Sequence, residues 1–170
     1  MDRKIFKLPL LAAAAGMVLR FFTQLILIFM MDGNAEWTDR MNTNMFIVRT
    51  LMSIALIIGI GLLLRKTFDR RTMLKAATLL ALIILAVYIM EQTSLYTSGY
   101  LTLLHYLYLP GEIFNWVTYL LFMVAGVDNY TRLFVIPHLL APYLFMMFTI
   151  RTKPLNKQNI LAKGENHNEI

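Results

Sequence analysis

The apolar residues of this chain are gathered into continuous runs that are as long as a membrane core is thick. The first run, residues 8–31, would form a helix of roughly 36 Å at 1.5 Å per residue, and a bilayer core measures roughly 30 Å. Charged residues make up 15% of the sequence, against about 25% in soluble domains. The sequence therefore predicts an all-α integral membrane protein whose helices pack as a bundle.

Hydropathy predicts about five transmembrane helices, which together form a single domain over residues 1–150. The expected spans are residues 8–31, 45–64, 76–96, 111–127 and 133–150, and a polar, basic tail follows over residues 151–170. The fourth span is short, and Pro137 and Pro142 are expected to kink the fifth. Two alternatives stay open. A re-entrant hairpin over residues 100–127 would leave four spans, and a short crossing helix over residues 95–110 would make six.

Lysine and arginine are distributed unevenly over the ends of these spans. Residues 1–7 carry three of them and residues 65–75 carry five, whereas residues 32–44 carry one. Because cytoplasmic loops hold the excess of basic residues, the N-terminus is expected in the cytoplasm and the 32–44 loop outside. An odd number of spans would place the tail outside, although its bases favour the cytoplasm, so its side stays open. The compact, span-filled chain leads us to expect a bacterial cytoplasmic membrane.

Two ionisable side chains are predicted to lie deep in the membrane and to pair with each other. Arg20 lies about 18 Å along the first span and Glu91 about 22 Å along the third, and both spans start on the cytoplasmic side. An arginine at such depth costs about 2.5–3.5 kcal/mol, so an ion pair would stabilise both groups. Arg49 lies about one turn inside the outer end of the second span. We expect it to extend to the interface and assign it no chemistry.

Polar side chains within the spans define the candidate site. Six of them are expected to form an intramembrane polar cluster that binds a ligand: Arg20, Gln24, Glu91, His105, Glu112 and His138. Intramembrane ionisable groups often mark substrate pathways, although membrane bundles also use them to hold helices together. The chain has no cysteine, its histidines lack metal-ligand spacing, and it has no zinc-protease, phosphate-loop or serine-hydrolase motif. We therefore expect no metal and no cofactor.

These features predict a small polytopic membrane protein that acts as a non-enzymatic accessory or interaction subunit of a larger membrane complex. Small-residue faces such as residues 12–16 suit close helix packing, and the chain has no soluble domain. One alternative is a membrane component that transports or binds a small ligand or a lipid, with a polar intramembrane pocket around Arg20 and Glu91. A further alternative is an intramembrane lipid-modifying enzyme that uses Glu91, His105 or Glu112 as acid or base.

The expected partners are the lipid bilayer and a larger membrane protein or a second copy. Nucleic acid is not expected, because the net charge of +6 records orientation in the membrane.

Overall fold

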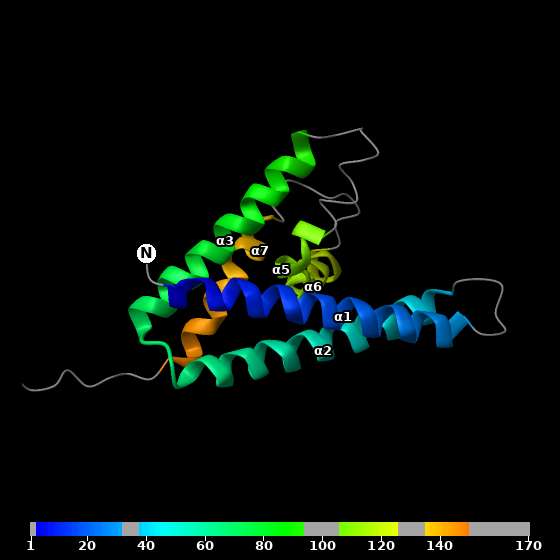
Figure 1. The fold of residues 1–170 in the computed structure, drawn as a ribbon. Coiled ribbons are helices and arrows are strands. Elements are labelled where there is room, and N and C mark those ends of the chain that lie inside the picture. Colours follow the sequence, from blue (N-terminus) through cyan, green and yellow to red (C-terminus); the bar gives the residue numbers. More distant parts are fainter. Residues whose placement is uncertain (1–2, 32–37, 94–105, 126–134, 150–170) are drawn as a thin grey trace, which may run out of the picture.

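The computed structural model of the chain describes residues 3–31, 38–93, 106–125 and 135–149. Within these ranges every regular element is a helix (Figure 1). In chain order they are a 3-10 helix η1 (Arg3–Phe6), α1 (Lys7–Met31), α2 (Asp39–Arg65), α3 (Arg70–Thr93), α5 (Leu109–Glu112), α6 (Asn115–Ala125), α7 (Val135–Leu140) and a second 3-10 helix, η3 (Ala141–Phe148). His105 and the tail over residues 151–170 lie outside the described residues.

Helices α1, α2 and α3 are long and apolar enough to cross a membrane, and they correspond to the first three expected spans. Their outward faces carry large exposed hydrophobic side chains, among them Phe29 (75% exposed) and Leu63 (68%). Soluble proteins rarely expose large contiguous apolar surface, whereas lipid is a suitable solvent for it. The described part of the chain is therefore all-helical, and its three long apolar helices suggest a membrane protein. The count of about five spans is not confirmed.

Polar residues extend α2 and α3 beyond the apolar runs that predicted them. α2 begins at Asp39 rather than at residue 45, and the Thr38 hydroxyl accepts a hydrogen bond of 3.3 Å from the N–H of Met41. This bond satisfies one of the free N–H groups at the helix start. α3 begins at Arg70 rather than at residue 76. Just before it, a hydrogen bond from the Thr72 side chain holds the pKa of Asp69 below its usual value.

The three long helices are not parallel. α1 and α2 lie side by side, and α3 leaves them at a wide angle, with α5, α6 and α7 between α3 and the α1–α2 pair (Figure 1). The shared core includes Phe114 and Phe145, which are both fully buried and meet edge to face with ring centroids 6.2 Å apart. The start of α1, the α2–α3 connection and the first turns of α3 share one end of the bundle, which we call the basic end. Its bases are Arg3, Lys4, Lys7, Arg65, Lys66, Arg70, Arg71 and Lys75.

The fourth expected span, residues 111–127, does not form one helix. The structure divides this region into α5 and α6, with a turn at Ile113 and Phe114. The 11 residues of α6 cover only about 16 Å at 1.5 Å per residue. α5 packs directly on the backbone of α1, because a Cβ at Gly16 would lie 2.0 Å from the carbonyl oxygen of Leu109. Glycine at this position is what lets the two backbones approach.

The fifth expected span, residues 133–150, changes helix type part of the way along. α7 passes into the 3-10 helix η3 at Ala141 and Pro142. Pro142 has no N–H, and its ring would clash with the carbonyl of His138 in a continuous α-helix. Because a 3-10 helix rises about 2.0 Å per residue, α7 and η3 together cover about 25 Å, nearly the thickness of a bilayer core.

η3 runs toward the basic end. The hydroxyl of Tyr143 lies 3.2 Å from that of Thr78, near the start of α3. Five residues later, the ring of Phe148 packs on Gly61 near the end of α2, where a Cβ would lie 2.4 Å from a ring carbon. The described part of the chain therefore ends beside the α2–α3 connection.

Candidate functional site

The carboxylate of Glu112 accepts hydrogen bonds from side chains on three other helices. Arg20 on α1 donates to Oε2 at 3.4 Å, and Asn115 on α6 donates to the same oxygen at 3.3 Å. Arg49 on α2 donates from its Nη2 to the other oxygen, Oε1. We call these four residues, Arg20, Arg49, Glu112 and Asn115, the Glu112 cluster. Glu112 is only 6% exposed, so the cluster ties α1, α2, α5 and α6 together inside the bundle.

A second set of polar contacts leads from the Glu112 cluster to His138. Asn115 turns its amide N–H to Glu112, so its carbonyl oxygen accepts the Tyr108 hydroxyl proton at 2.9 Å. The Tyr108 hydroxyl oxygen also lies 3.5 Å from Nε2 of His138, and Nδ1 of His138 lies 3.5 Å from the Thr118 hydroxyl.

Packing holds the His138 ring in this orientation. The ring stacks on Tyr108, with centroids 5.9 Å apart and an interplanar angle of 18°, and it meets Phe114 edge on. A Cβ at Gly111 would lie 3.1 Å from Nε2, so this glycine gives the ring its place against α5. His138 is buried. These contacts fix the position of the His138 ring between Tyr108, Phe114 and α5.

Four polar atoms beside the cluster are buried without a hydrogen-bond partner: Nε of Arg49, Oγ1 of Thr50, Oγ of Ser53 and Nε1 of Trp116. The first three belong to one turn of α2. Trp116 follows Asn115 on α6, which packs against α2, as the contact of the Phe46 and Tyr119 rings shows (centroids 5.9 Å apart). These atoms therefore lie on the facing sides of α2 and α6. Nε of Arg49 and Nε1 of Trp116 are donors only, whereas the two hydroxyl groups can both donate and accept.

The charges of the cluster are also unequal. Arginine stays protonated in proteins, so two guanidinium groups face the single carboxylate of Glu112. Whatever the state of Glu112, the four residues of the cluster carry an excess positive charge of at least one. Within the described ranges, no group of three His, Asp or Glu side chains is arranged to hold a metal ion.

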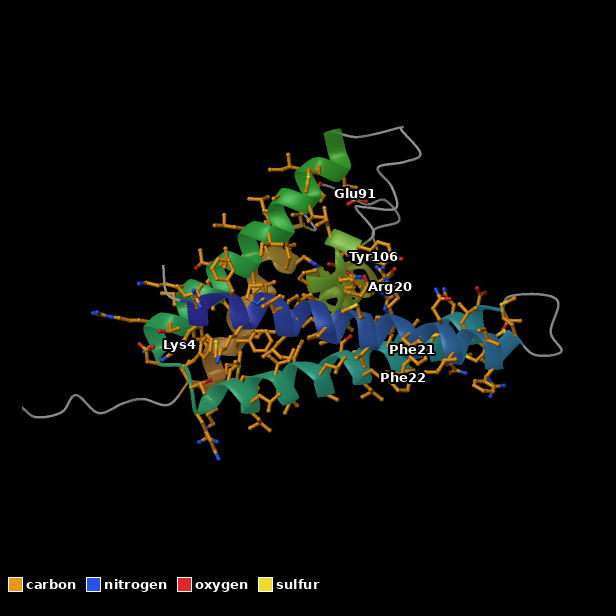
Figure 2. All side chains as sticks on the ribbon, in the orientation of Figure 1. Lys4, Arg20, Phe21, Phe22, Glu91 and Tyr106 are labelled. Carbon is orange, nitrogen blue, oxygen red and sulfur yellow. The ribbon has the colours of Figure 1, made fainter. Side chains whose placement is uncertain are left out.

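The structure brings together three of the six predicted site residues. Arg20 and Glu112 are in direct contact, and His138 joins them through Tyr108 and Asn115. Gln24 is exposed on α1. Glu91 is exposed near the end of α3, apart from Arg20 (Figure 2). The predicted Arg20–Glu91 ion pair is therefore wrong, and the carboxylate beside Arg20 is Glu112. The error arose because depth along a helix says nothing of the angle at which α3 leaves α1.

Arg49 is the principal residue that sequence reasoning missed. The expectation that it extends to the interface is wrong, because its guanidinium turns inward to Glu112. The sequence did contain a signal for this contact, in two sets of residues that recur at helical spacing. Phe46, Arg49, Thr50 and Ser53 recur at helical spacing on α2, and Glu112, Asn115, Trp116 and Tyr119 recur at the same spacing on α5 and α6. Matched stripes of polar and aromatic residues favour two helix faces that pack together.

Comparisons with known proteins add no assignment: no family model, no curated protein and no solved structure matches the chain. Function therefore has to be inferred from the Glu112 cluster and its surroundings.

Proposed function

We propose that this chain is a membrane-embedded ligand-binding protein and that the Glu112 cluster holds an anionic group of the ligand. The proposal is carried by one observation. The N–H at Nε of Arg49 is buried without an acceptor, although Nη2 of the same guanidinium donates to Glu112. Nε1 of Trp116, the residue after Asn115, is likewise buried without an acceptor. An anionic oxygen would supply the missing acceptor and balance the excess positive charge.

The four unpaired atoms do not support anion binding equally. A serine or threonine hydroxyl in a helix is able to donate to the carbonyl four residues earlier, so the backbone of α2 offers Thr50 and Ser53 an acceptor. The Arg49 and Trp116 N–H groups are donors only, and their own helices offer them no such acceptor. A buried donor without an acceptor costs about 1–3 kcal/mol, which is a large share of the stability of a small bundle. Arg49 and Trp116 are therefore the residues on which the proposal rests.

The chemistry of arginine narrows the ligand to oxyanions. Its planar guanidinium offers two parallel N–H groups, which match the oxygens of a carboxylate or a phosphate. The site is therefore centred on Arg49, with Arg20 beside it, and replaces the pocket around Arg20 and Glu91 that the sequence predicted. Trp116 supplies a further neutral donor.

A binding measurement with a matched pair of variants tests the proposal. The purified chain in neutral detergent is titrated calorimetrically with sodium phosphate, sodium oleate and phosphatidylglycerol at constant ionic strength. We expect at least one to bind, and Arg49→Gln to weaken that binding about tenfold, as loss of a hydrogen bond to a charged group implies. Arg40→Gln makes the same charge change at an exposed position of α2 and should leave binding unchanged. Equal losses in both variants, or no binding to any anion, would refute the proposal.

We also propose a topology in which α5 and α6 enter the membrane and return, so that the chain crosses four times. α5 starts against the middle of α1, and α6 is too short to cross. The pairs Arg49–Glu112 and Phe46–Tyr119 indicate that α6 runs back toward the Asp39 end of α2. α7 and η3 then lead to the basic end. With the basic end in the cytoplasm, both ends of the described chain lie on that side.

The other functional predictions from the sequence stay predictions. An accessory subunit would bury some of the exposed apolar surface of α1, α2 and α3, which suits lipid and a partner helix alike. Purification in mild detergent, followed by mass spectrometry, tests it: a second protein in stoichiometric amount would support that function. Transport, enzymatic activity and a bacterial cytoplasmic membrane likewise stay predictions.

A further inference from the structure

The two arginines of the Glu112 cluster lie where the buried faces of their helices meet the lipid-facing surface. On α1, helical spacing places Arg20 between the buried Gly16 and the exposed Met17 and Gln24. On α2, Arg49 lies between the buried Ser53 and the half-buried Met52. Their side chains are 20% and 26% exposed, against 8% for Glu112. The two arginine side chains are therefore more exposed than the carboxylate that they share, and the exposed apolar side chain of Met17 lies beside Arg20.

The depth of Arg49 is suited to a lipid headgroup. The polar residues 39–44 begin α2, and its apolar run starts at Met45. Arg49 follows four residues later, about 6 Å along the helix. With the apolar run of α2 placed across the bilayer core, Arg49 is nearer to the headgroups at the Asp39 end of α2 than to those at the basic end. The Glu112 cluster, which its guanidinium joins, therefore lies in the leaflet at the Asp39 end.

We propose that the anionic group at the Glu112 cluster is the phosphate of a phospholipid from the leaflet at the Asp39 end of α2. This inference rests on the proposed function and names the ligand class for that same site. The phosphate lies against Arg49 and Arg20, and the acyl chains lie along the exposed apolar surface beside Met17 on α1. Tyr106, which is 64% exposed shortly before α5, adds an aromatic side chain of the kind found at headgroup level.

A phospholipid fits this position better than a water-soluble anion does. A soluble phosphate would have to leave water and pass the headgroup layer to reach the cluster, and desolvation of a charge is costly. A phospholipid brings its phosphate from within the same leaflet, and its acyl chains suit the exposed apolar side chain beside Arg20. The net charge of the cluster favours an anionic lipid over a zwitterionic one.

The test is native mass spectrometry of the full chain, released from neutral detergent after incubation with one probe at a time. The probes are dioleoyl-phosphatidylglycerol, dioleoyl-phosphatidylcholine and inorganic phosphate. We expect phosphatidylglycerol to be retained about tenfold more than phosphatidylcholine, and Arg49→Gln to remove that preference. Arg40→Gln should keep it. Arg49→Lys keeps the charge but loses the planar fork, so an intermediate preference is expected, and this variant decides the question if Arg49→Gln does not fold.

The outcomes separate this inference from the proposed function. Equal retention of the two lipids would overturn the lipid inference. Arg49-dependent binding of inorganic phosphate without a lipid preference would also overturn it, while leaving an anion-binding protein in place. Absence of all three probes from wild-type protein would overturn both.

Discussion

At the scale of single residues, Glu112 holds the bundle together through three donors from three helices. Removing its charge leaves two guanidinium groups without their shared carboxylate, whereas removing Arg49 leaves Glu112 with Arg20 and Asn115. Breaking a buried ion pair from one side costs about 3–5 kcal/mol, and the partial exposure of both arginines reduces that figure. We expect Glu112→Gln to lower the thermal unfolding midpoint in detergent by more than Arg49→Gln does. Glu91→Gln, at an exposed position, is the control and should have little effect.

Gly16 and Gly59 offer a second comparison of single residues. A methyl group at Gly16 would meet the carbonyl of Leu109, whereas nothing lies within 4 Å of a Cβ at Gly59. Gly16→Ala should destabilise the protein by about 1–3 kcal/mol, the usual cost of overpacking, because α5 has to move away from α1. Gly59→Ala should be neutral or stabilising, since alanine favours a helix by up to about 1 kcal/mol over glycine. Thermal unfolding of both variants measures the difference, and equal effects would contradict the contact of α5 with α1.

At the scale of elements, η3 contributes to the core through one face of a 3-10 helix. Phe145 is fully buried against Phe114, whereas Met147, two residues later, is 81% exposed. Phe145→Ala should destabilise the protein by about 3–5 kcal/mol, as other large-to-small core changes do. Met147→Ala should change the unfolding midpoint little. A large effect of Met147→Ala with a small effect of Phe145→Ala would show that η3 packs with the opposite face.

The elements differ in how far they could be predicted from the sequence. The three long helices were predictable, because a chain in lipid has to satisfy its backbone hydrogen bonds within each apolar run. The start of α5 was not, because proline and glycine in succession, here Pro110 and Gly111, usually indicate a turn. Pro110 instead occupies the first turn of α5, where its missing N–H is harmless, and Gly111 makes room for His138. Arg49 was missed because its partner lies 63 residues away, so that only a comparison of the stripe on α2 with the stripe on α5 and α6 could have indicated the contact.

At the scale of the whole molecule, the direction of η3 determines on which side of the membrane the chain ends in the proposed topology. The absence of cysteine from the sequence makes single-cysteine labelling clean. Thr67→Cys lies in the α2–α3 connection, Thr38→Cys at the opposite end of α2, and Thr152→Cys just after the described chain. In spheroplasts, an impermeant maleimide should label Thr38→Cys only, whereas after permeabilisation all three should react. Labelling of Thr152→Cys together with Thr38→Cys in intact cells would contradict four crossings.

The long separation between Arg49 and Glu112 has a consequence for biogenesis. α1 and α2 leave the ribosome first, each with an arginine at membrane depth, and Glu112 follows Arg49 by 63 residues. At 5–20 residues per second that interval is roughly 3 to 13 s. During it, both arginines have to be kept by water, by headgroups or by the insertion machinery, because the carboxylate that they share has not yet been made. Once α5 has been synthesised, Glu112 can bind both arginines and so join α1 to α2.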